Sequence, residues 1–186
     1  MTISDRAKEV VATFLQCGDI VVDATMGNGW DTLFLAEKVG AEGQVFSFDI
    51  QEAAVESTRK KLQKAGLLNR CQLFQQGHET MVEVVPSGIG AAMFNLGYLP
   101  YADKELVTRA TTTLIALRGA LELLREDGGL TIVCYHGHPG GAEEAELVLS
   151  WALARKKEYE VNCPTQLPDD AKPFLITLKK SVRFAG

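Results

Sequence analysis

Residues 20–31 read IVVDATMGNGWD, an apolar run that ends in an acidic residue and a glycine-containing turn. Three apolar residues lead into Asp23, glycines stand at Gly27 and Gly29, and a helical pattern opens after Asp31. This order is typical of a buried strand followed by a turn that holds a ligand against the start of a helix. The stretch therefore predicts the first strand and the ligand-binding turn of an α/β protein.

The rest of the chain alternates between strand-like and helix-like segments. Strands are expected at 20–25, 44–50, 71–76, within 88–97, and at 129–136, 159–164 and 174–181, and helices at 31–39, 52–65, 79–85, 103–125 and 143–156. A first helix, capped by Ser4, precedes them. Strands that alternate with helices predict a parallel sheet with helices on both faces. The last two strands have no helix between them, so we expect the last one to insert antiparallel.

The expected fold is thus an α/β, doubly wound, mostly parallel seven-stranded sheet with an antiparallel last strand. The 186 residues fit one domain, 1–186, with residues 1–18 as an N-terminal helix packed on the rest. No apolar run reaches the length of a membrane span, and the N-terminus lacks the apolar core of an export signal. We therefore expect a cytoplasmic protein without a membrane partner.

The net charge and the small number of cysteines and histidines indicate which ligands and partners the chain is suited to bind. The formal net charge of −5 provides no overall attraction to nucleic acid, although basic clusters occur near residues 59–64, 155–157 and 179–183. The four cysteines form no CxxC pair and only three histidines are present, so we expect no metal site. A nucleic-acid partner remains open but is not favoured by charge.

Three ligand classes compete for the glycine turn. A P-loop is excluded because no lysine follows the glycines. A dinucleotide fingerprint would place a third glycine where Thr32 stands. S-adenosylmethionine has no diphosphate to house: the glycines would let the backbone approach its methionine part, and Asp23 would meet its ammonium group directly or through water. Asp49, at the end of the next strand, can accept hydrogen bonds from a ribose in either an NAD or an S-adenosylmethionine site.

A polar residue ends the fourth strand, where FNLG (94–97) is followed by Tyr98. The segment resembles the amino-methyltransferase pattern N-P-P-Y, with Asn95, Leu96, Gly97 and Tyr98 in its place. There the side-chain carbonyl and the next backbone carbonyl accept hydrogen bonds from an amino group and direct its nitrogen toward a sulfonium methyl. Asn95 is therefore predicted to face the reacting centre, with an ordinary turn-forming asparagine as the alternative.

The segments DATMGNGWDTLFLA, FDIQ, GHE, FNLGYLP and YHGHPGG, in this order, resemble the family first labelled putative rRNA methylase (YtqB/MnmM type) over nearly the whole chain. The resemblance implies a Rossmann-like class I methyltransferase fold, S-adenosyl-L-methionine as cofactor, and a homodimer. It also implies methylation of the aminomethyl nitrogen of wobble 5-aminomethyl-2-thiouridine in the anticodon loop of tRNA.

The resemblance assigns roles to individual positions. The cofactor turn and the helix after it would comprise Thr25, Met26, Gly27, Asn28, Gly29, Asp31 and Thr32. Asp49 and Gln51 would hold the ribose, and Gly77 and His78 would border the adenine. Asn95 would face the reacting centre, with Tyr98, His136 and His138 on the substrate side.

Other interpretations stay open at this point. With the same cofactor, the substrate could be rRNA or a small-molecule amine. In a different class, the chain could be an NAD-binding oxidoreductase or a nucleotide-binding sensor, which Thr32 and the Asn95 motif disfavour. His136 and His138 could also belong to a structural turn rather than to a substrate site.

Overall fold

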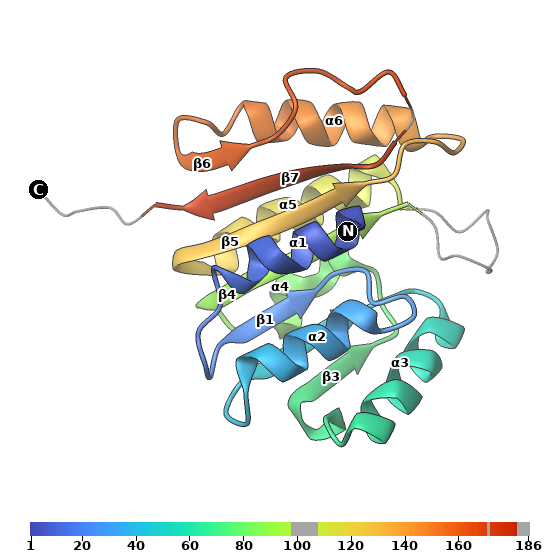
Figure 1. Ribbon diagram of the computed structural model, residues 1–186, viewed down its shortest axis with the longest axis vertical. Helices are drawn as coiled ribbons and strands as arrows, with labels where there is room; N and C mark the ends of the chain where they lie inside the picture. Colours follow the sequence, from blue (N-terminus) through green and yellow to red (C-terminus); the bar gives the residue numbers. More distant parts are fainter. Residues whose placement is uncertain (98–107, 171, 182–186) are drawn as a thin grey trace, which may run out of the picture.

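The computed structural model describes residues 1–97, 108–170 and 172–181 and contains a seven-stranded sheet of order β3-β2-β1-β4-β5-β7-β6 (Figure 1). The strands are β1 (Ile20–Asp23), β2 (Gln44–Phe48), β3 (Cys71–Phe74), β4 (Ile89–Leu96), β5 (Leu124–Cys134), β6 (Tyr159–Asn162) and β7 (Phe174–Lys180). β1 to β5 pair in parallel, whereas β7 runs antiparallel to both β5 and β6. The predicted doubly wound sheet with an antiparallel last strand is confirmed.

In the described part of the chain, six α-helices cover the two faces of this sheet. They are α1 (Ile3–Ala12), α2 (Trp30–Val39), α3 (Glu52–Ala65), α4 (Met81–Val84), α5 (Ala110–Leu123) and α6 (Gly141–Leu153), and short 3-10 helices occupy Leu68–Arg70 and His78–Thr80. Apolar residues of α1, α2 and α3 pack with Val21 and Met93. The next residues along the same strands, Val22 and Phe94, pack with apolar residues of α4, α5 and α6. Because consecutive strand residues point to opposite faces, both faces of the central strands must be apolar.

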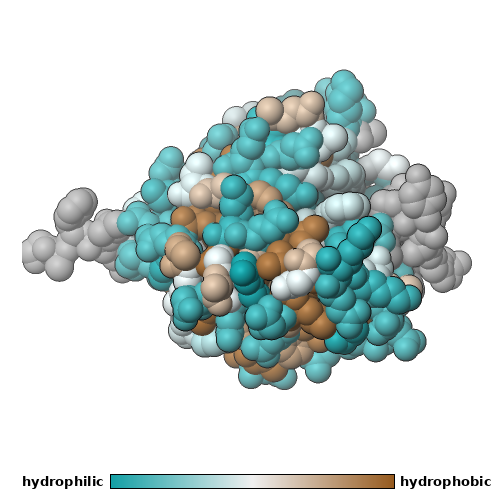
Figure 2. Space-filling view, turned by 60° about the horizontal axis from the view of Figure 1, so that its bottom comes forward, coloured by the Kyte–Doolittle hydropathy of each residue, from teal (hydrophilic) through white to brown (hydrophobic). Residues whose placement is uncertain are grey.

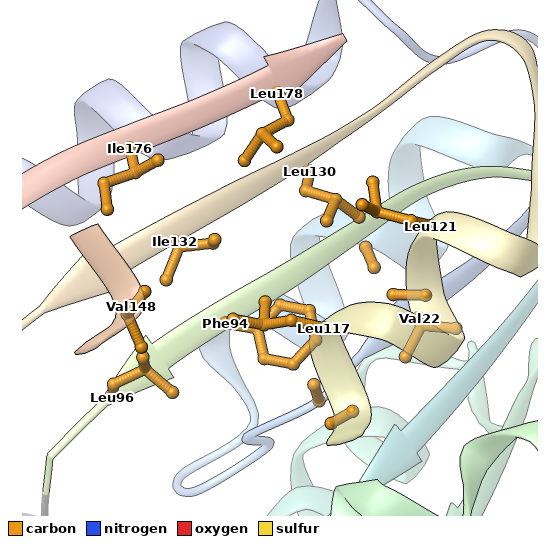
Figure 3. Packing of buried hydrophobic residues seen from close by; sticks show 14 of the residues in the cluster. Val22, Phe94, Leu96, Leu117, Leu121, Leu130, Ile132, Val148, Ile176 and Leu178 are labelled. Carbon is orange, nitrogen blue, oxygen red and sulfur yellow. The ribbon is translucent and has the colours of Figure 1, made fainter. Parts of the chain in front are cut away.

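The larger of the two core clusters lies on the α5 face and is shown in Figure 3. Phe94 of β4 and Leu117 of α5 are both fully or almost fully buried within it, as are Ile132 of β5 and Ile176 of β7. Each fully buried apolar side chain of this size contributes roughly 1.5–3 kcal/mol to folding. This packing fixes β4 at the centre of the sheet and thereby the position of the polar residue near its end.

Several expected strands end earlier than predicted, such as β2 at Phe48 instead of residue 50, and two helix boundaries need a fuller correction. The cap of α1 is Thr2 rather than Ser4: Thr2 Oγ1 accepts a hydrogen bond from Asp5 N (3.1 Å), and Thr2 N donates to the Asp5 carboxylate (2.8 Å). The helix expected at 103–125 is present from Ala110 to Leu123, with 103–107 outside the described residues. Residues 124–125 belong to β5 instead, because the Arg125 guanidinium donates two hydrogen bonds to the Asp19 carboxylate and one to the Phe14 carbonyl.

The surface mixes polar and apolar residues. Figure 2 shows a face on which hydrophilic residues predominate and apolar residues lie between them in smaller groups. Among the residues that the structure describes, none of the helices combines the length and the apolar character needed to cross a bilayer.

The connection from β1 to α2 depends on a close approach at Gly29. This residue has φ 76° and caps α2, and a Cβ placed on it would lie 2.9 Å from Thr58 Cα and 2.6 Å from Thr58 Oγ1 of α3. Real Cβ atoms do not come this close to backbone atoms, so only glycine lets α2 begin against α3. Gly66, which ends α3 with φ 70°, has open space where its Cβ would be.

We expect Gly29→Ala to destabilise the protein far more than Gly66→Ala. Both changes force a left-handed alanine at a cost of about 1–2 kcal/mol, but only the first adds a steric overlap worth roughly another 1–3 kcal/mol. Urea denaturation of the two variants measures the difference directly. Equal losses would show that the contact with Thr58 relaxes without cost.

Candidate active site

A cavity of about 640 Å³ lies beyond the carboxyl ends of β1, β2 and β4. In open α/β sheets, ligands bind at this edge of the sheet. The connection after β1 runs to one face of the sheet and the connection after β4 to the other, which leaves a crevice between them. The predicted site residues that line this cavity are Thr25, Met26, Gly27, Asn28, Asp31, Asp49, Gln51, Gly77, His78 and Asn95. Residues from four separate segments of the sequence (25–31, 49–51, 77–78 and 95) thus surround one space.

The Asp49 carboxylate ties the glycine turn to the end of β2. One oxygen accepts a hydrogen bond from Gly27 N (3.0 Å) and the other from Gln51 N (2.9 Å). A carboxylate has about four acceptor positions, so each oxygen retains capacity for a ligand hydroxyl in the cavity. Burial raises the pKa of Asp49, while the two backbone hydrogen bonds act in the opposite direction.

Asp23 lies beneath the turn and does not line the cavity. Its carboxylate is fully buried and accepts hydrogen bonds from Thr32 Oγ1 (2.6 Å) and Thr25 N (3.2 Å). Thr32 and Gly29 are likewise absent from the cavity wall. The geometry therefore gives Asp23 and Thr32 a part in holding the turn, and Gly29 a part in helix packing, whereas their ligand contacts stay a prediction.

Asn95, the second residue from the end of β4, has an unusual set of partners. Its backbone N–H donates to Thr25 Oγ1 (2.8 Å), and its side-chain Nδ2 donates to the Asp31 carboxylate in a short hydrogen bond. Asp31 in turn forms an ion pair with Lys8 Nζ at 2.9 Å. The remaining polar atom, Asn95 Oδ1, is buried and has no hydrogen-bond partner within the described part of the chain.

His78 lines the cavity with a buried, uncharged imidazole ring. Its ring is 7% exposed, its Nδ1 lies 3.0 Å from the Ala24 carbonyl oxygen, and it packs at a tilt against Phe94 with ring centroids 5.9 Å apart. Burial lowers the pKa of His78, so the ring is uncharged at neutral pH. Together with Gly77 it forms a surface suited to a flat, uncharged heterocycle.

His136 and His138 follow the end of β5, where contacts with neighbouring segments hold their rings. His136 is buried, with Nε2 2.8 Å from the Lys172 carbonyl oxygen and its ring edge-on to Phe174. His138 Nδ1 lies 3.1 Å from the Pro139 carbonyl oxygen. Neither histidine lines the cavity, and their place on the substrate side stays a prediction. Tyr98 is outside the described residues.

Several residues of the cavity wall were not predicted from the sequence. From α1, Ser4 and Lys8 reach the cavity, and Ser4 Oγ lies 3.1 Å from the Tyr135 hydroxyl. Arg109 and Thr112 of the α5 N-terminus line its other side. A sequence signal existed for α1, since Ser4 and Lys8 are four residues apart and therefore share one helix face.

The proteins that this chain resembles are described as methylases or methyltransferases. Residues 45–180 match the family model described as putative rRNA methylase. The chain is 44% identical over 163 residues to the Arabidopsis thaliana protein named tRNA (mnm(5)s(2)U34)-methyltransferase, chloroplastic. That alignment covers 82% of this chain but only 60% of the length of the Arabidopsis protein.

Solved structures resemble the chain along most of its length. A putative rRNA methylase from Clostridium thermocellum is 40% identical with a TM-score of 0.91, covering 97% of this chain and 98% of that one. A putative methyltransferase from Streptococcus mutans, solved in complex with SAH, is 34% identical with a TM-score of 0.85 and the same coverage. The predicted Rossmann-like methyltransferase fold is confirmed by this likeness.

The buried Asp23 makes a testable contribution to the pH dependence of stability. Burial, followed by the nearby Asp31 carboxylate, raises the pKa of Asp23 from 3.8 to about 7. A carboxyl whose pKa is higher in the folded than in the unfolded state stabilises the folded state while it is protonated. For Asp23 this contribution to the free energy of unfolding is lost as the pH rises from about 4 to about 7. At neutral pH, close to this pKa, the buried carboxyl is therefore partly ionised, and its ionised form disfavours folding.

We expect Asp23→Asn, which keeps the shape but cannot ionise, to gain stability relative to the wild type as the pH rises through this window. The gain is at most about 4 kcal/mol and is constant above the window. Urea denaturation of both proteins at pH 4, 5.5, 7 and 8 measures it. Parallel stability curves would contradict the raised pKa.

Proposed function

The chain belongs to the putative rRNA methylase family, and on this premise we propose that it is an S-adenosylmethionine-dependent N-methyltransferase. Its proposed substrate is the aminomethyl group of wobble 5-aminomethyl-2-thiouridine in tRNA. The observation that carries the proposal is the joint placement of Asp49 and Asn95 on one cavity, at the ends of β2 and β4. The Arabidopsis relative, named for tRNA methylation at U34, supports the choice of substrate.

The residues present fit this cofactor. The paired acceptors of Asp49 suit the two hydroxyls of a ribose, and the neutral His78 with Gly77 suits an adenine. The turn from Thr25 to Asn28 brings backbone groups to the cavity. No lysine follows its glycines, as the binding of a nucleoside triphosphate by a P-loop would require. The Streptococcus mutans relative, solved with SAH, supports the same assignment.

When bound, S-adenosylmethionine supplies a sulfonium methyl group: the amine lone pair forms a bond to the methyl carbon, and the carbon–sulfur bond breaks with its electron pair going to sulfur. The secondary ammonium product then releases one proton to water, which leaves a neutral secondary amine. The protein's part is to align and desolvate the amine, which accounts for a large share of the rate in such reactions. Asn95 Oδ1, buried without a partner, is an acceptor that an amine N–H can satisfy.

An unpaired nucleoside could be held by aromatic surface beside the cavity. Trp30 is 62% exposed and Tyr135 37% exposed, and both line the cavity. Sequence-specific RNA recognition commonly stacks splayed bases on such side chains. Arg109, exposed at the same cavity, adds a positive charge where a phosphate could approach despite the negative net charge.

The remaining parts of the proposal rest on the sequence. They are a single methyltransferase domain over residues 1–186, a homodimer, a cytoplasmic location, and a position for Tyr98 beside the substrate. For His136 and His138 we propose structural roles at the end of β5, in view of their contacts with Lys172 and Pro139.

The direct test is methyl transfer to tRNA that carries 5-aminomethyl-2-thiouridine, followed by nucleoside mass spectrometry. We expect this nucleoside to gain one methyl group, and neither ribosomal RNA nor a free alkylamine to be methylated. Methylation of ribosomal RNA alone would retain the cofactor and replace the substrate. Tighter binding of NAD than of S-adenosylhomocysteine would remove the methyltransferase assignment altogether.

Two variants should separate cofactor binding from chemistry. Asp49→Ala removes hydrogen bonds to a charged acceptor, and we expect it to weaken S-adenosylhomocysteine binding by about 10- to 100-fold. Asn95→Ala should leave that affinity within about threefold while lowering the single-turnover rate at least about 100-fold. Calorimetry and rapid-quench assays measure the two quantities. The reverse pattern would exchange the proposed roles.

A further inference from the structure

We propose that Lys8 and Asp31 are positioning residues that fix the orientation of the Asn95 amide, so that its carbonyl oxygen is the acceptor left for the substrate amine. This inference rests on the proposed N-methyltransferase function. It adds the N-terminal helix α1 to the functional machinery, because Lys8 lies on that helix.

The three side chains form a continuous line from α1 through α2 to β4. Lys8 Nζ lies 2.9 Å from Asp31 Oδ1, and the other oxygen, Asp31 Oδ2, accepts the short hydrogen bond from Asn95 Nδ2. The side chains of Lys8 and Asp31 are only 23% and 11% exposed, so water screens the pair weakly. All three residues line the same cavity.

Charge decides which end of the amide faces Asp31. An ionised carboxylate can only accept hydrogen bonds, so a flipped amide would set the Asn95 carbonyl oxygen against a negatively charged oxygen. Lys8 occupies one carboxylate oxygen of Asp31 and thereby directs the other toward Asn95. The backbone of Asn95 is held separately by Thr25 Oγ1 at 2.8 Å. Both the position and the orientation of the amide are thus fixed before a ligand binds.

This orientation has a catalytic consequence. As the amine nitrogen attacks a sulfonium methyl, positive charge develops on the nitrogen, and its hydrogen bond to a carbonyl oxygen strengthens. An acceptor already held in place stabilises the transition state more than the ground state. If the amide were free to flip, its NH₂ group would face the amine for part of the time and repel the developing charge.

The chain offers a matched control. Lys8 and Lys38 both place their ammonium groups over the Phe34 ring, at 5.8 Å and 5.6 Å from its centroid. Only Lys8 pairs with Asp31 among the described residues. Lys8→Met and Lys38→Met therefore remove the same charge and the same ring contact, but only the first removes the support of Asp31. Lys8→Arg keeps a cation that can bind the carboxylate.

The first measurement does not depend on activity. In ¹⁵N-edited NMR spectra, the Asn95 side-chain NH₂ signal is assigned by its loss in Asn95→Ala. We expect this signal to shift in Lys8→Met and Asp31→Asn, and to stay close to its wild-type position in Lys8→Arg and Lys38→Met. An unmoved signal in Lys8→Met overturns the proposal, even if the wild type proves inactive on the proposed tRNA substrate.

The second measurement is a double-mutant cycle on the single-turnover rate. We expect Lys8→Met to slow methyl transfer about tenfold in the wild-type background and less than about twofold in Asn95→Ala, because Lys8 acts through Asn95. Lys8→Arg should restore most of the rate, and S-adenosylhomocysteine affinity should change little in all variants. Equal losses in both backgrounds, or a loss of cofactor affinity that matches the loss of rate, would overturn the proposal.

Discussion

The buried carboxylate of Asp23 is the constraint on which the rest of the site depends. It accepts hydrogen bonds from Thr25 N and from Thr32 Oγ1, so it joins the turn after β1 to the first turn of α2. Thr25, held in this way, offers its hydroxyl oxygen to the backbone N–H of Asn95 on the neighbouring strand. One carboxylate that water does not reach thus sets the relative positions of the turn, the helix and the end of β4.

Three aspartates lie in or beside the cavity, and differences in their burial and hydrogen-bond partners give them different roles. Asp23 is enclosed and supports the frame, Asp49 keeps acceptor capacity toward the cavity, and Asp31 is paired with Lys8. The carboxylates of Asp31 and Asp49, which line the cavity, suit a cationic sulfonium ligand. The Lys8 ammonium balances one of these charges, so the site attracts a cation without leaving every carboxylate unpaired in a poorly solvated region.

Local patterns predicted much of the fold, whereas side-chain partners distant in sequence could not be predicted. The α3 boundaries, Glu52 to Ala65, followed from a charged segment that stops at Gly66, and the antiparallel β7 followed from the missing crossover helix. The cavity-lining residues of the turn followed from the strand–glycine pattern. The contacts that place His136 against Lys172 and Lys8 against Asp31 depend on how separate elements pack, and no local rule specifies them. For the same reason, the hydrogen bonds that join Asp23 to Thr25 and Thr32 were not predicted from the sequence.

The order of the last strands has a consequence for how the sheet is completed during synthesis. β6 precedes β7 in the chain, yet within the described residues it pairs only with β7, which lies between it and β5. Until residues 174–180 emerge from the ribosome, β6 has no place in the sheet and the edge of β5 remains open to other chains. The edge of β5 that β7 covers in the folded protein is therefore unprotected until β7 has been added.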